Sequence, residues 1–118
     1  MAIIFRINMN VLPEKQKEVL QTLLSLIEPP GMEQGCLNYG VFNDIRDKYI
    51  FNLISEWQDR QFLNLHLQSE RVTVLLGTKS LLSEPMKIQI DTVSAIEGVE
   101  AVNAARKKRR DLTLQEHL

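Results

Sequence analysis

The first residues of the chain alternate between apolar and polar side chains. All odd positions from 3 to 11 are apolar, whereas Arg6, Asn8 and Asn10 stand between them. Because successive side chains of a β-strand point to opposite faces, the alternation predicts a strand over residues 3–11 with one buried face.

Three later segments carry the same signal. Residues 36–43 and 49–57 are strand-like runs joined by a polar connection of hairpin length, and residues 86–93 alternate again. The two joined runs are expected to pair antiparallel. Together with the first strand, these segments predict a sheet of four strands.

Between the first two strands the apolar spacing becomes helical. Pro13 suits the first turn of a helix, and Glu14 complements the helix dipole. The Pro-Pro-Gly sequence at 29–31 ends the predicted helix. One face of this helix is expected to carry Leu20, Leu23, Leu24 and Ile27.

Two further helices are predicted before Pro85. Asp59 is a good N-cap for a short helix through Gln68, and Ser69 can cap a second one. Gly77 weakens the second helix, since glycine costs about 1 kcal/mol relative to alanine in a helix interior. The helical spacing there is carried by Val72, Leu75, Leu76, Lys79 and Leu82.

The order β-α-β-β-α-β with an extra helix is the split βαβ, or ferredoxin-like, arrangement. The predicted fold class is therefore α+β, with a four-stranded antiparallel sheet covered by helices on one face. The alternation assigns to the covered face Phe5, Ile7, Leu37, Val41, Phe51, Leu53, Ile88 and Ile90.

The opposite face of the sheet also contains apolar residues. It is predicted to carry Ile4, Phe42, Ile50 and Ile54 among Arg6, Asn38, Asn52 and Glu56. This is more apolar surface than a sheet face exposed to water normally carries. We therefore expect a homodimer through the sheet faces, which would form a dimeric α/β barrel.

Composition narrows the remaining possibilities. With 118 residues, 44% of them hydrophobic, the chain can bury a core as a single domain. The net charge of -1 gives no chain-wide field for nucleic acid or an anionic membrane. A single cysteine excludes an internal disulfide, and neither a signal peptide nor a membrane-spanning segment is evident, so we expect a cytoplasmic protein.

The C-terminal segment has no place in this sheet. We divide the chain into a domain over residues 1–94 and a basic, helical or disordered extension over residues 95–118. Five consecutive basic residues, Arg106 to Arg110, allow contact with a polyanion or a membrane surface, but a solvated tail is favoured because the chain as a whole is nearly neutral.

Three groups of residues carry a family resemblance. They are Glu33, Gly35, Cys36 and Tyr39, then Ser55-Glu56-Trp57-Gln58-Asp59, then Leu65-His66-Leu67-Gln68-Ser69. Their order and spacing resemble the antibiotic biosynthesis monooxygenase domain family, over roughly residues 3–93. The resemblance implies a dimeric α/β barrel and, in part of the family, cofactor-independent oxygenation of aromatic polyketides or quinols.

Such oxygenation needs a substrate that can itself reduce dioxygen, held in an apolar pocket beside a group that assists its deprotonation. We expect the pocket between the helices and the covered sheet face. His66 is the candidate base or proton donor, because histidine titrates near neutral pH. Substrate contacts are expected from Trp57, Tyr39, Phe62 and Leu76.

Each candidate also has a structural interpretation. A core residue with satisfied polar atoms is the more common case for His66 and Trp57, and it is as common as a substrate contact for Tyr39. Glu56 should face the dimer sheet and pair with Arg6 or a partner residue, and Cys36 is interpreted as a small buried residue rather than a reactive thiol.

The haem-degrading branch of the same family does not fit. Aligned through the Glu-Trp strand, His66 takes the position of that branch's helix tryptophan, and Leu76 takes the position of its haem-ligating histidine. Asn8, by alternation, lies with Arg6 rather than on the pocket side. We therefore expect no cofactor and no metal site.

The leading function is a cofactor-independent monooxygenase-like enzyme acting on a small aromatic or quinol-type molecule. The alternative is a dimeric small-molecule-binding or accessory protein of the same fold that catalyses nothing. Besides the second copy and the small molecule, no membrane and no nucleic acid partner is expected.

Overall fold

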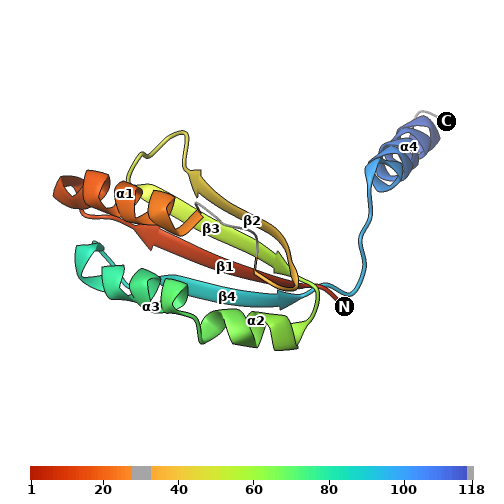
Figure 1. Ribbon diagram of the computed structural model, residues 1–118. Helices are drawn as coiled ribbons and strands as arrows, with labels where there is room; N and C mark the ends of the chain where they lie inside the picture. Colours follow the sequence, from red (N-terminus) through yellow and green to blue (C-terminus); the bar gives the residue numbers. More distant parts are fainter. Residues whose placement is uncertain (28–32, 117–118) are drawn as a thin grey trace.

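The computed structural model describes residues 1–27 and 33–116, with side chains described as far as residue 109. A single antiparallel sheet has the strand order β2-β3-β1-β4 (Figure 1). Its central strand β1 pairs with both β3 and β4, and β2 pairs with β3 as a hairpin. The strands are β1 (Ile3–Asn10), β2 (Cys36–Asn43), β3 (Ile50–Trp57) and β4 (Lys87–Thr92).

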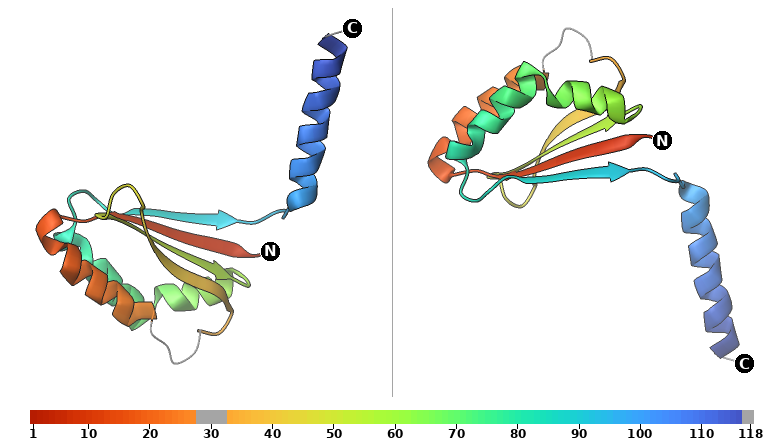
Figure 2. Two further views of the ribbon diagram at one scale, coloured as in Figure 1. Left: turned by 90° about the horizontal axis from the view of Figure 1, so that it is seen from above. Right: turned by 90° about the horizontal axis from the view of Figure 1, so that it is seen from below.

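The helices of the body all cover the same face of this sheet (Figure 2). A short 3-10 helix, η1, leads into α1 between β1 and β2, whereas α2, α3 and a second 3-10 helix, η2, connect β3 to β4. This confirms the ferredoxin-like α+β fold. The segments are η1 (Pro13–Lys15), α1 (Gln16–Ile27), α2 (Arg60–Leu67), α3 (Glu70–Leu76) and η2 (Gly77–Leu81).

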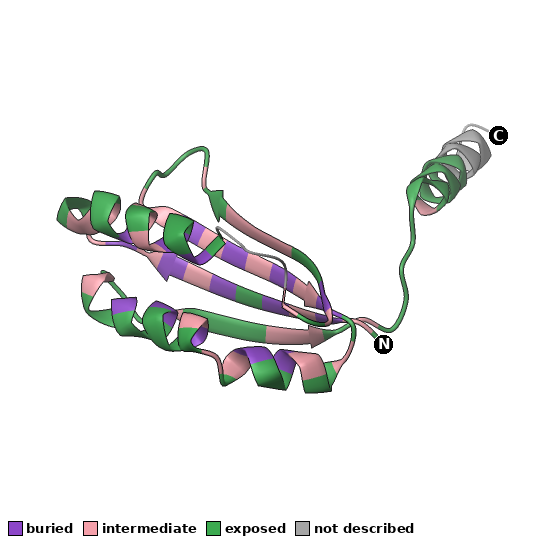
Figure 3. Cartoon of the chain, viewed as in Figure 1, coloured by how far each residue is buried: buried purple, intermediate pink, exposed green. Residues whose placement is uncertain are grey.

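The core lies between the sheet and these helices, as the buried bands in Figure 3 show. Alternate side chains of β1 point into it, and each faces an inward residue of β3; Ile7 pairs with Leu53, and Met9 with Phe51. The helices contribute Val19, Leu23, Leu63 and Leu75, all buried. The predicted strand alternation is thus confirmed for the two central strands.

Two residues assigned to the covered face are exposed. Leu37 is 46% exposed, because the pairing of β2 with β3 shifts register between Cys36 and Asn38 and turns this residue away from the core. Ile88 pairs with Ile7 on the expected face but is 51% exposed, since β4 is an edge strand.

Two helix predictions also need correction. The buried residues of α1 are Val19, Leu23 and Leu26, whereas Leu24 and Ile27, which had been placed on the core side, are exposed. The third helix does not continue to Leu82: α3 ends at Leu76, where the chain tightens into η2. Gly77 stands at this change, consistent with the low helix propensity of glycine.

The C-terminal segment forms a helix that stands away from the sheet (Figures 1 and 2). This helix, α4 (Val99–Glu116), follows an extended connection. Ile96, Val99 and Val102 are all exposed, so the helix is solvated where its side chains are described. Within the described residues, no helix is long and apolar enough to cross a membrane.

Candidate functional site

His66 is buried at the end of α2, with only 2% of its surface exposed. The helix begins as predicted at Asp59, whose Oδ1 accepts a hydrogen bond from the Phe62 backbone N at 3.2 Å. Leu63 and His66 are its buried residues, one turn apart. The same helical face that anchors α2 on the core therefore carries the histidine inward.

Aromatic side chains from three strands surround the imidazole. The Trp57 ring of β3 lies 4.5 Å from it between ring centroids, tilted by 31°. Tyr39 of β2 and Phe5 of β1 meet it edge-on, with centroid distances of 6.1 and 6.2 Å. The structure thus brings together three of the predicted site residues, His66, Trp57 and Tyr39, and adds Phe5, which had been assigned only to the core.

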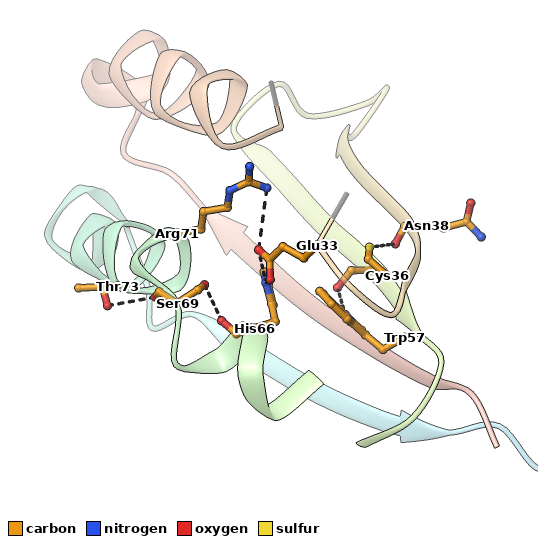
Figure 4. Close-up of polar contacts among 9 residues, drawn as sticks. Glu33, Cys36, Asn38, Trp57, His66, Ser69, Arg71 and Thr73 are labelled. Atoms are coloured by element: carbon orange, nitrogen blue, oxygen red, sulfur yellow. Dashed lines mark hydrogen bonds and ion pairs between the residues drawn. The ribbon is translucent and has the colours of Figure 1, made fainter. Parts of the chain in front are cut away.

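A carboxylate completes the surroundings of the histidine (Figure 4). Nδ1 of His66 lies 2.9 Å from both Oε1 and Oε2 of Glu33. Nη1 of Arg71, in the first turn of α3, lies 3.9 Å from Oε1 of the same carboxylate. Which group donates in this pair depends on the tautomer of the imidazole.

A tight turn places Glu33 at this position. Its backbone carbonyl accepts a hydrogen bond from the Cys36 N at 3.0 Å, and Gly35 has a φ of 79° at the third position of the turn. This is the position at which a type II turn requires positive φ. A Cβ on Gly35 would overlap the Phe62 ring, so the turn also needs glycine for its close approach to α2.

The indole of Trp57 is held inside the core. Its Nε1–H donates to Ser55 Oγ at 2.9 Å, and both residues are buried. The predicted inward orientation of Trp57 is confirmed. Glu56 points the other way, but it pairs with Asn38 at 3.2 Å, whereas Arg6 binds Asp91 at 3.0 Å. Of the two expected partners of Glu56, Arg6 is therefore not the one it binds, and a residue of a second copy stays a prediction.

Burial alters two acidic groups beside the histidine. Desolvation raises the pKa of Tyr39, and it is the largest effect on that hydroxyl. Desolvation, followed by the charge of Glu33, also raises the pKa of Cys36. Tyr39 is therefore a neutral hydrogen-bond donor near neutral pH. Cys36 is a protonated thiol, which agrees with its interpretation as an unreactive residue.

The other predicted substrate contacts lie outside the ring cluster. Phe62 is partly buried against the Gly35 turn, and Leu76 is 45% exposed at the end of α3, where Leu75 is the residue that enters the core. Sequence reasoning did not assign a role to Glu33 or Arg71. Glu33 did belong to the resembling segment, but no local pattern marks Arg71.

Ser69 acts differently from its prediction. It stands at the N-cap position of α3 without a side-chain capping bond, and its Oγ donates instead to the His66 carbonyl at 2.6 Å. The Ser69 backbone N donates to the same carbonyl at 2.9 Å. Ser69 therefore satisfies the backbone carbonyl of His66 at the C-terminal end of α2.

A cavity of about 240 Å³ opens on the opposite, helix-free face of the sheet. The side chains of Arg6 and of the Asn8–Asn52 pair line this cavity, whereas His66 lies on the helix-covered face. Asn8 therefore lies on the same face as Arg6, as the alternation predicted. Among the described residues, no group of three or more His, Cys, Asp or Glu side chains is arranged to hold a metal ion. The cavity is lined by Arg6, Asn8, Asn52, Lys87, Ile88 and Gln89.

The topology and the buried histidine define a ferredoxin-like domain with an aromatic-lined polar centre. The chain belongs to the antibiotic biosynthesis monooxygenase family, whose sequence profile matches residues 2–75. This stretch covers β1 to α3 and therefore includes every residue of the His66 cluster. The resemblance seen in the sequence is confirmed.

The chain is similar to proteins with and without a named activity. The uncharacterized protein sll1783 of Synechocystis is 29% identical over 84 residues, which are 70% of this chain but only 57% of that protein. YcnE of Bacillus subtilis, named provisionally as a monooxygenase, is 25% identical over 73% of this chain and 92% of its own length. A crystal structure of an antibiotic biosynthesis monooxygenase is 25% identical, with a TM-score of 0.71 over 80% of this chain and 100% of that one.

Proposed function

We propose that the protein is a cofactor-independent monooxygenase acting on a small aromatic or quinol-type substrate, with His66 as the base. The observation that supports this proposal is the burial of a histidine among the rings of Phe5, Tyr39 and Trp57. Aromatic walls suit a flat substrate, and an imidazole is suited to take a proton from a phenol or enol near neutral pH.

The proposed reaction begins with proton transfer. The substrate O–H or activated C–H bond breaks, its electron pair stays on the substrate, and the proton moves to the imidazole. The resulting anion is electron-rich enough to reduce dioxygen. The anion and dioxygen form a carbon–oxygen bond, and the resulting peroxide takes the proton back from the imidazole. Loss of a second proton from the same substrate carbon then breaks the O–O bond. One oxygen atom stays on the substrate, the other leaves with both protons as water, and the substrate supplies all four electrons.

Tyr39 has a role in this scheme because its hydroxyl remains protonated. Burial raises the pKa of Tyr39, so the phenol can donate a hydrogen bond to the substrate oxygen on which negative charge develops. Trp57, whose N–H is already bound to Ser55, contributes its ring face rather than a donor.

Oxygen consumption tests the proposal. The protein is mixed with a panel of hydroquinones and anthrones, and oxygen uptake is followed together with incorporation of ¹⁸O into the product. His66→Gln should abolish uptake, since general-base catalysis contributes roughly 100- to 10,000-fold. Leu65→Ala, an exposed change next to the histidine on α2, should retain it. Uptake that survives His66→Gln contradicts the assignment.

The second candidate is a binding or accessory protein of the same fold. The contact between Nδ1 of His66 and Glu33 favours it, because a buried histidine whose polar atom is paired in this way also satisfies a purely structural role. Tight binding of a quinol or anthrone without oxygen uptake would support this candidate.

We also propose that two copies pack through the helix-free sheet face. Phe42 on that face is 54% exposed, and Ile4 and Ile54 are partly exposed. Burial of these side chains by a second sheet would remove apolar surface from water, at roughly 25 cal/mol per Å². Sedimentation should give a dimer, and Ile54→Glu should give a monomer that keeps its far-UV spectrum. A wild-type monomer at micromolar concentration contradicts the proposal.

A further inference from the structure

We infer that Glu33 and Arg71 are positioning residues that fix His66 as the Nδ1–H tautomer and leave Nε2 as its basic nitrogen. The catalytic consequence rests on the proposed function, whereas the tautomer is a property of the protein without substrate. Neither residue would contact the substrate in this assignment; both act through the imidazole.

The geometry at Nδ1 leaves little choice of proton position. Both carboxylate oxygens of Glu33 lie 2.9 Å from Nδ1, and a carboxylate offers only acceptors. Within the described part of the chain, Nε2 makes no hydrogen bond. The nitrogen opposite the carboxylate is therefore the one that can accept a proton, as in other sites where one ring nitrogen is fixed by its partner.

The cluster is also prepared for the charge that proton transfer creates. Among the described residues, the charged groups in the cluster are Glu33 and Arg71, which have opposite charges, and the titratable neighbours Tyr39 and Cys36 are neutral. When His66 takes a proton, the imidazolium lies directly against the carboxylate, and the cluster as a whole gains one positive charge. That charge balances the substrate anion formed in the same step.

Arg71 orients the carboxylate rather than the ring. Its Nη1 is 3.9 Å from Oε1 of Glu33, a loose and partly exposed contact, so the ion pair alone contributes little to stability. It can still favour one rotamer of Glu33, whose backbone is already held by the Gly35 turn. The expected effect of removing Arg71 is therefore smaller than that of removing Glu33.

The tautomer can be measured directly. ¹⁵N–¹H correlation spectra of imidazole-labelled protein distinguish a protonated Nδ1 from a protonated Nε2. The wild type should show the Nδ1–H form at His66, with its signals identified by their loss in His66→Gln. In Glu33→Ala the constraint is gone, and a mixed population with the Nε2–H form should appear. Glu70→Gln, which removes the same charge from the neighbouring helix turn, should leave the spectrum unchanged.

Two results would overturn the inference. One is an Nε2–H tautomer in the wild type, and the other is an unchanged tautomer in Glu33→Ala when circular dichroism shows that the variant is folded. If Glu33→Ala does not fold, Glu33→Met provides the same comparison, because its side chain has a similar length but no oxygen that accepts from Nδ1–H. An unchanged, pure Nδ1–H form in that variant also contradicts the inference.

Kinetics with a substrate found in the oxygen screen test the catalytic part. Glu33→Gln should lower kcat by roughly 100- to 10,000-fold with little change in KM, since orientation of a catalytic histidine by a carboxylate acts on the transition state. Arg71→Met should give a smaller loss in kcat, with Arg71→Lys partly restoring it. Equal losses in kcat for Glu33→Gln and Glu70→Gln would contradict the positioning role. If no substrate is turned over but the tautomer changes as expected, the proposed function fails and the assignment of the tautomer stands.

Discussion

The indole of Trp57 lies against the imidazole of His66, with 4.5 Å between ring centroids and 31° between ring planes. Such an aromatic contact holds the imidazole on one side, while Glu33 pairs with its Nδ1. The histidine is therefore fixed by two residues outside its own helix, which explains how one short helix presents an oriented imidazole.

This contact makes the fluorescence of the protein a reporter of His66. Trp57 is the only tryptophan in the chain, and the imidazole is in ring contact with its indole. His66→Gln removes this ring contact, so we expect the emission maximum of the folded variant to shift relative to the wild type. His117→Gln, the variant of the other histidine, should leave the emission spectrum unchanged. Identical spectra of folded His66→Gln and the wild type would contradict the ring contact.

The Ser55 hydroxyl should stabilise the fold through Trp57. Ser55→Ala leaves the buried indole N–H without its acceptor, and an unsatisfied buried donor costs about 1–3 kcal/mol. Urea unfolding of the variant should show a loss of that order in the free energy of unfolding. Ser80→Ala, an exposed change, is the control and should be close to neutral. A Ser55→Ala variant as stable as the wild type would contradict the importance of this hydrogen bond.

Two glycines offer a matched test of the turn that carries Glu33. Gly35→Ala should lower the free energy of unfolding by more than about 1 kcal/mol, because φ is 79° there and the new methyl meets the Phe62 ring. Gly77→Ala should be neutral or stabilising by up to about 1 kcal/mol, since its φ is -64° and no atom lies within 4 Å of the added Cβ. Equal effects of the two substitutions on urea unfolding would contradict this account of the turn.

The alternation of inward and outward positions along the strands predicted much of this architecture. The alternation along β1 and β3 correctly separated Trp57, which enters the core, from Glu56, which faces the opposite side. This alternation holds in the two central strands because each is hydrogen-bonded to a strand on both sides, which leaves little freedom of register. It failed at Leu37, where a register shift in the edge strand reverses the side chain without any mark in the sequence.

Tertiary contacts explain the remaining differences. Val19 and Leu24 are both plausible core residues of α1, and only the angle at which the helix meets the sheet decides that Val19 is buried. The pair between Glu33 and His66 joins residues 33 positions apart, so no local spacing could reveal it. His66 itself was predictable, but its carboxylate partner was not.

Tyr39 should make the stability of the protein depend on alkaline pH. Desolvation raises the pKa of Tyr39 in the folded protein, whereas the unfolded chain releases this proton at the ordinary tyrosine pKa. The neutral hydroxyl therefore contributes stability that is fully present below the ordinary value and is lost as the pH rises through the raised one. Urea unfolding from about pH 8 to about pH 11 should show a smaller decline in Tyr39→Phe than in the wild type. Equal declines in the two proteins would mean that Tyr39 is as solvated in the folded state as in the unfolded chain.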